Sequence, residues 1–127
     1  MKRDMELVRE LLIAIEASAP LDVGDGDSEE RIVGQGLPAR QPETLVYHLC
    51  LLRDAAFIEA TPVMNSKGIN RAIKVYRLTW DGHEFLDVAR SDTIWTKAKT
   101  MLAQAGVCLS LEAMKIALKR VQEAALG

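Results

Sequence analysis

The chain has little of what marks several special classes of protein. It has only two cysteines, Cys50 and Cys108, in no zinc-site spacing, so free thiols and no metal or cofactor are expected. No apolar run reaches the about 18 residues that a membrane span requires. The start, MKRDMELVRELL, carries charges through its apolar stretch and does not resemble a signal peptide. We therefore expect a cytoplasmic protein without a membrane partner.

Aromatic residues and surplus bases are also scarce. Aromatics make up only 5% of the 127 residues, so the core must be largely aliphatic. Lys and Arg total 16 against 18 Asp and Glu, a net charge of −2, which argues against a polybasic coat. The halves differ, since residues 1–60 hold six bases and twelve acids while residues 61–127 hold ten bases and six acids. This separation indicates a charged face.

Apolar periodicity predicts a mainly α-helical chain with a small β-hairpin, an α+β fold in a single domain. The expected helices cover residues 4–18, 42–56, 80–90 and 92–105, with a last helix after Ser110. The hairpin joins FIEATPVM to INRAIKVYRLT through the turn NSKG, residues 65–68. An acidic loop, residues 21–30, and a short strand, residues 30–33, are expected before the second helix.

Residue chemistry predicts the helix ends and the buried faces. The expected caps are Asp4, Gln41, Thr79 and Ser110 at helix starts and Gly106 at a helix end. The second helix is expected to bury Leu45, Leu49, Leu52 and Ala56. Gly82 is expected to allow a close backbone approach, and Trp80 and Trp95 to be core residues or helix-docking anchors.

The order helix, strand, helix, hairpin, helix is typical of a winged helix-turn-helix core, here residues 1–90, followed by two C-terminal helices within residues 91–127. Three blocks, MKRDMELVRELLIAIE, YHLCLLRDAAFIEA and RLTWDGHEFLDVARSDTIW, resemble the domain of unknown function 2513 family. Its members are short bacterial and prophage-borne proteins with a winged-helix core. The likeness covers about residues 1–102. It implies the fold only, because the family has no established activity. The family's usual Gly before the apolar pair is Ala56 here.

This pattern predicts a DNA-binding transcriptional regulator that contacts duplex DNA. Helix 42–56 would enter the major groove, and the basic wing, residues 65–77, would hold phosphates. Between Val63 and Trp80 there are four bases and no acid. The candidate contacts are Arg40, Gln41, Thr44, Tyr47 and His48 on the helix, and Lys67, Arg71 and Lys74 on the wing.

A second interpretation is a non-enzymatic protein-interaction module of phage or prophage origin on the same fold. The acidic loop and the low basicity favour it, as does Leu51 if its side chain is exposed on the second helix. No enzyme is expected, since no phosphate loop, paired-carboxylate motif or nucleophile elbow is present. The apolar stripes of helices 92–126 fit either an intramolecular cap or a homodimer interface.

Overall fold

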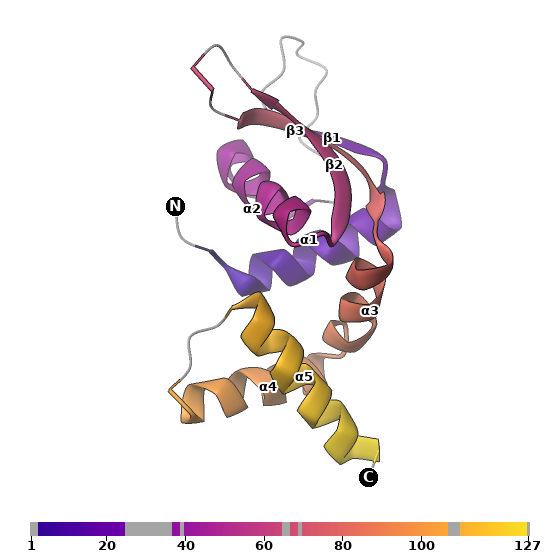
Figure 1. The fold of residues 1–127 in the computed structure, drawn as a ribbon, viewed down its shortest axis with the longest axis vertical. Helices are drawn as coiled ribbons and strands as arrows, with labels where there is room; N and C mark the ends of the chain where they lie inside the picture. The colour runs from indigo at the N-terminus through magenta and orange to yellow at the C-terminus, as the bar shows by residue number, and fades with distance from the viewer. Residues whose placement is uncertain are drawn as a thin grey trace. The chain divides into compact units, whose positions relative to one another are not determined.

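The computed structural model describes residues 3–24, 37–38, 40–64, 67–68, 70–106 and 110–126, without the side chains of residues 70, 71, 125 and 126. The described residues form five helices and one three-stranded antiparallel sheet (Figure 1), which confirms the expected α+β class. They divide into two compact units, Met1–His83 and Glu84–Gly127. The division falls inside helix α3 (Trp80–Ala89), earlier than the boundary at residue 90 that the sequence indicates.

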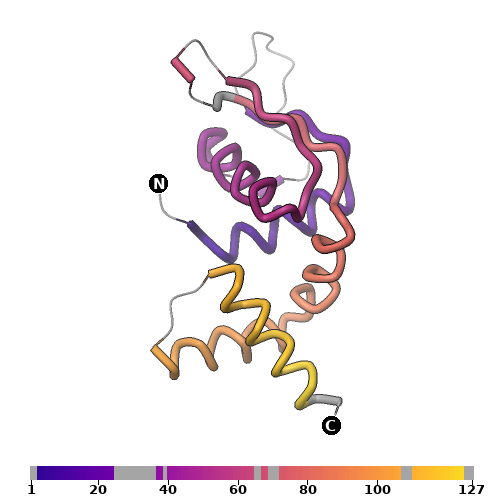
Figure 2. The backbone as a smooth tube through the Cα atoms, viewed as in Figure 1, coloured from indigo at the N-terminus to yellow at the C-terminus, as the bar shows by residue number. Residues whose placement is uncertain are grey.

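The first unit is built around the three-stranded sheet. Its elements before α3 are α1 (Met5–Ser18), β1 (Leu21–Gly24), α2 (Pro42–Asp54), β2 (Ile58–Met64) and β3 (Asn70–Leu78). The sheet order is β1-β3-β2, so the last strand is central and pairs antiparallel with both others. Helix α2 packs against all three strands, and α1 packs against β3 and α2. The backbone passes directly from α2 into the hairpin (Figure 2).

Helix α1 follows the sequence expectation closely. The Asp4 carboxylate accepts the backbone N–H groups of Glu6 and Leu7 at 3.0 and 3.3 Å, which satisfies two donors that a helix start leaves free. The helix ends at Ser18, because Pro20 disfavours helical backbone in the residue before it. Its apolar stripe, made of Leu7, Leu11, Leu12 and Ile15, is buried.

Strand β1 corrects the expected acidic loop. Residues 21–24 fall within the expected loop, but they form a strand that pairs with β3, and Val23 is buried. Four residues are too few to show an alternating pattern, and the hydrogen-bonding partner lies far away in the sequence. The expected strand at residues 30–33 and the rest of the acidic loop lie outside the described residues.

The hairpin confirms the expected pairing of the two runs. Its register extends from Ile58 opposite Leu78 to Met64 opposite Asn70, with two irregularities along the way. Ile73, Val75 and Leu78 are buried, whereas Lys74, Tyr76 and Arg77 are exposed. Burial therefore alternates from Ile73 to Tyr76, and the irregularity between Glu59 and Ala60, which leaves Tyr76 without a partner in the register, places two exposed residues in succession.

The second unit contains the end of α3 with α4 (Asp92–Gln104) and α5 (Leu111–Leu126). Trp95 is buried and meets Phe85 edge to face, with ring centroids 6.4 Å apart. Helices α4 and α5 pack on each other. The stripe residues Ala98, Leu102, Met114, Leu118 and Val121 are all buried within this single chain. The expected caps Ser110 and Gly106 are confirmed, because the Ser110 hydroxyl accepts the Ala113 N–H and Gly106 has a φ of +71°.

No helix in the described part of the chain has both the length and the apolar character needed to cross a membrane.

Candidate nucleic-acid interface

The start of α2 presents polar side chains to solvent. Pro42 occupies the first helical position, where its missing N–H costs nothing. Gln41 is at the cap position but makes no side-chain capping hydrogen bond, and it is exposed. Arg40 is also exposed, and its Nη1 lies 3.4 Å from Asp4 Oδ2. Gln41 is therefore free to contact a ligand, whereas Arg40 already faces a carboxylate.

His48 is not part of the exposed surface, which corrects the sequence expectation. Its side chain is 1% exposed. Its Nε2 accepts the backbone N–H of Asp4 at 2.9 Å, so the ring proton is on Nδ1, which donates to the Thr44 carbonyl at 2.8 Å. The sequence showed a polar residue on the second helix but not that α1 starts against it. His48 joins α2 to α1 and cannot reach a phosphate.

Tyr47 and Thr44 are half-buried beside this histidine. The Tyr47 ring meets the His48 ring edge to face, with centroids 5.4 Å apart. This contact orients the Tyr47 ring, while part of the side chain stays accessible. Arg40, Gln41, Thr44 and Tyr47 thus remain as the accessible candidates from the first half of α2.

The end of α2 is closed by a turn that fixes the helix relative to the hairpin. The N–H of Ala56 donates to the Arg53 carbonyl, and the N–H of Phe57 donates to the Leu52 carbonyl, both at 3.0 Å. This pair of bonds is a Schellman motif, whose central residue adopts left-handed backbone. That residue is Ala56, with a φ of +62°. Ala56 is exposed, which corrects its expected place in the buried stripe, while Leu45, Leu49 and Leu52 are buried as expected.

The turn also holds the start of α3. The Phe57 carbonyl accepts the N–H of Thr79 at 2.9 Å, and the Thr79 hydroxyl donates to the Ala56 carbonyl at 2.6 Å. The same hydroxyl accepts the N–H of Gly82, so Thr79 caps α3 as expected. A Cβ atom on Gly82 would overlap the Phe57 carbonyl. The expected close approach at Gly82 is therefore confirmed.

The surface of the wing carries a smaller excess of positive charge than its sequence suggests, because acids from neighbouring strands lie beside its bases. Asp22 on β1 stands directly opposite Lys74, which in turn stands opposite Thr61 on β2. Glu59 on β2 binds Arg77 through both carboxylate oxygens, at 2.6 and 3.1 Å. The segment between Val63 and Trp80 has four bases and no acid in sequence. In the sheet, however, an acid from a neighbouring strand lies beside two of these bases, Lys74 and Arg77.

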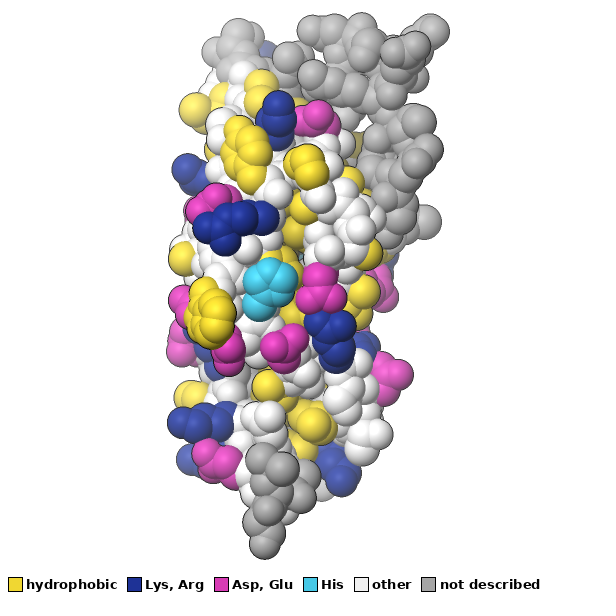
Figure 3. Space-filling view, turned by 90° about the vertical axis from the view of Figure 1, so that its right-hand side faces the viewer, with side chains coloured by type: hydrophobic (Ala, Val, Ile, Leu, Met, Phe, Trp, Pro, Cys, Tyr) yellow, Lys and Arg dark blue, Asp and Glu magenta, His cyan; other side chains and the backbone are white. Residues whose placement is uncertain are grey.

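The surface view shows the same mixture. On the face turned to the viewer in Figure 3, basic and acidic side chains lie close together with hydrophobic ones between them. A phosphate clamp needs a local excess of positive charge. The two strand positions Lys74 and Arg77 do not supply such an excess, because Asp22 and Glu59 share their surface.

The remaining wing candidates lie toward the turn. Lys67 is exposed. The backbone of Arg71 is in β3, but its side chain lies outside the described residues, so its predicted contact with DNA stays a prediction. Sequence reasoning missed the pairings of Asp4 with Arg40, of Asp22 with Lys74 and of Glu59 with Arg77. Only strand register and helix packing reveal them.

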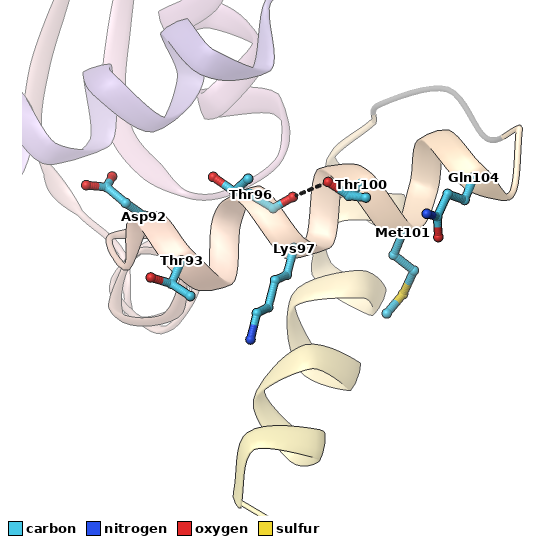
Figure 4. A pocket seen from close by; sticks show the side chains of 7 residues that line it. All are labelled: Asp92, Thr93, Thr96, Lys97, Thr100, Met101 and Gln104. Atoms are coloured by element: carbon cyan, nitrogen blue, oxygen red, sulfur yellow. Dashed lines mark hydrogen bonds between the residues drawn. The ribbon is translucent and has the colours of Figure 1, made fainter.

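A separate groove runs along α4 in the second unit (Figure 4). It has a volume of about 640 Å³, and its described lining consists of Asp92, Thr93, Thr96, Lys97, Thr100, Met101 and Gln104. The Thr100 hydroxyl donates to the Thr96 carbonyl at 3.0 Å. This lining has no Cys or His, and no cluster of three potential metal ligands occurs among the residues with described placement.

Trp80 corrects another expectation. It is 77% exposed at the start of α3, so it is not a core residue, whereas Trp95 is 2% exposed and is one. Six large hydrophobic side chains are exposed among the described residues, and four of them, Val63, Met64, Tyr76 and Trp80, belong to the hairpin or follow it directly.

The fold and this surface define a small α+β protein with a polar helix start beside a hairpin. The chain belongs to the family described as hypothetical protein (DUF2513), whose model matches residues 2–108. It is 34% identical over 116 residues to an uncharacterized protein of Haemophilus influenzae, covering 91% of this chain and 90% of the relative. No solved structure matches significantly.

Proposed function

We propose that the chain is a non-enzymatic DNA-binding protein that acts as a transcriptional regulator. The observation that carries the proposal is the β1-β3-β2 sheet with α2 packed on it and leading directly into the hairpin. In this arrangement a helix enters the major groove, and the hairpin lies along the backbone. The accessible polar start of α2 supports the same assignment.

The proposed contacts are fewer than the sequence suggests. Gln41 and Thr44 would contact base edges, and Tyr47 would contact the sugar-phosphate backbone. Arg40, Lys67 and Arg71 would contact phosphates. His48 is excluded by its burial, and Lys74 makes a weak contribution because Asp22 stands opposite it.

Fluorescence anisotropy with random duplex DNA over a salt series tests this proposal. Each phosphate contact adds about −0.9 to the slope of log affinity against log salt, so three basic contacts predict a slope of about −3. No binding at low salt would contradict the proposal. The exposed Glu43 opposes phosphate, so Glu43→Gln should raise the affinity for all sequences alike.

A matched pair of variants separates the wing from general charge. Lys67→Glu with Arg71→Glu should weaken binding uniformly across sequences and reduce the slope by about 2. Lys119→Glu with Arg120→Glu makes the same change of charge on α5, where both side chains are exposed. Equal losses in the two variants would show that net charge, and not the wing, drives the binding.

A protein-interaction module is the second candidate, and the acids opposite Lys74 and Arg77 favour it. A wing of mixed charge suits a protein surface better than a polyanion. If DNA does not bind at any salt concentration, this candidate replaces the first.

A further inference from the structure

The outer face of the sheet is its polar face, on the side away from the buried residues. We define it by Asp22 of β1, Glu59, Thr61 and Val63 of β2, and Lys74, Tyr76 and Arg77 of β3. The pairing register places Asp22, Lys74 and Thr61 side by side across the three strands. The Tyr76 hydroxyl lies 3.3 Å from the Thr61 hydroxyl, and the ion pair between Arg77 and Glu59 crosses the same two strands.

This face has an apolar centre of the kind found at protein interfaces. Tyr76 and Val63 are 44% and 40% exposed on adjacent strands. Trp80, 77% exposed, follows the end of β3 by two residues. Exposed Tyr and Trp are enriched at the energetic centres of protein interfaces, where they combine a large apolar area with a polar tip. The concentration of exposed large side chains in and directly after the hairpin indicates a binding surface.

The charges on this face indicate what binds there. Arg77 and Glu59 neutralise each other. Lys74 and Asp22 stand opposite each other, yet among the described residues neither has an ion-pair or hydrogen-bond partner of its side chain. A face with one free charge of each sign offers little to a polyanion or to a strongly charged peptide. It is complementary to itself, because a two-fold axis can bring Lys74 of each copy to Asp22 of the other.

We propose that the outer face binds a second copy of this chain in an isologous dimer. The stripes of α4 and α5, the other candidate interface, are already buried within one chain and leave Ile116 as the large exposed apolar side chain of their described part. The proposal is independent of DNA binding, since it uses neither the polar start of α2 nor the bases near the hairpin turn.

Sedimentation equilibrium of the full chain without DNA tests the proposal. We expect a concentration-dependent dimer. Tyr76→Ser should weaken it about tenfold or more, as removal of a central interface aromatic does. Ile116→Ser on α5 is the matched control, since it also removes an exposed apolar side chain and should leave the dimer unchanged.

Complementary charge reversals make the test specific. Lys74→Glu places two acids together in each half of the dimer, and Asp22→Lys places two bases together, so each variant alone should associate about tenfold or more weakly. Mixed together, the two variants should form a heterodimer, because each reversed residue then meets an opposite charge. Circular dichroism of each variant checks that it folds.

A chain that stays monomeric at all concentrations would overturn the proposal. A dimer whose affinity changes with neither Lys74→Glu nor Asp22→Lys would also overturn it, as would a dimer that is weakened only by Ile116→Ser. DNA binding by a monomer would leave the proposed function intact while removing this inference.

Discussion

The two ends of α2 differ in how they are held. At its start, the side chain of the cap residue Gln41 makes no hydrogen bond to the first turn, and Arg40 is exposed. Its end is closed by two turn bonds and buried against the start of α3 through the Phe57 carbonyl. The backbone of α2 is therefore fixed at its C-terminal end, whereas Gln41 at its start is exposed and makes no capping hydrogen bond.

The largest expected effect comes from breaking the closed end. Gly82→Ala should destabilise the protein by about 3 kcal/mol, because the new Cβ overlaps the Phe57 carbonyl and backbone must move. Helix propensity favours alanine by only about 1 kcal/mol, so the overlap decides the sign. Urea unfolding followed by circular dichroism measures the change.

Glu84→Ala in the same helix is the control, since this side chain is exposed and should change stability little. If Gly82→Ala were as stable as the original chain, α3 would not be seated on the turn as described.

The middle of α2 is held by His48, and its removal has the next largest effect. His48→Phe keeps a ring of similar size but leaves the Asp4 N–H without its acceptor. An unsatisfied, partly buried donor costs about 1–3 kcal/mol. His48→Gln restores an acceptor and should recover part of that loss. Equal stability of the Phe variant and the original would show that the hydrogen bond to Asp4 contributes nothing.

Sequence reasoning succeeded where structure depends on near neighbours in the chain. The caps at Asp4, Thr79 and Ser110 and the helix end at Gly106 need only local chemistry, and all four are found. It failed where distant segments meet. His48 is buried because the start of α1 packs against it, and the residues next to His48 in the sequence do not predict that contact.

The wing illustrates the same limit. In the sequence, the segment between Val63 and Trp80 contains bases and no acid. In the sheet, however, β3 also pairs with β1, which lies outside that segment. Asp22 is far from Lys74 in sequence and adjacent to it in the sheet. A strand of four residues carries too weak a pattern to predict that pairing.

A smaller effect should come from relieving strain at the closed end. Ala56 holds left-handed backbone, which costs an L-residue about 1–2 kcal/mol and costs glycine almost nothing. Ala56→Gly removes this strain, but glycine also increases the conformational entropy of the unfolded chain, which offsets part of the stabilisation. We therefore expect a net increase in the free energy of unfolding of about 1 kcal/mol. Thermal and urea unfolding measure it, with Ala55→Gly, in right-handed backbone, as a control that should destabilise. A loss of stability in Ala56→Gly would contradict the strain.

The smallest effect should come from closing the open end. Gln41→Ser supplies a side-chain oxygen that can accept an N–H of the first turn, which stabilises a helix by about 0.5–1 kcal/mol. The serine side chain then faces the helix and no longer reaches outward as glutamine does. If Gln41 contacts bases, the variant should be more stable and bind its DNA site more weakly, whereas Gln41→Ala should weaken binding without added stability. Unfolding and anisotropy on the same samples separate these effects. A variant that gains stability and keeps full affinity would show that the start of α2 is open for another reason than contact with DNA.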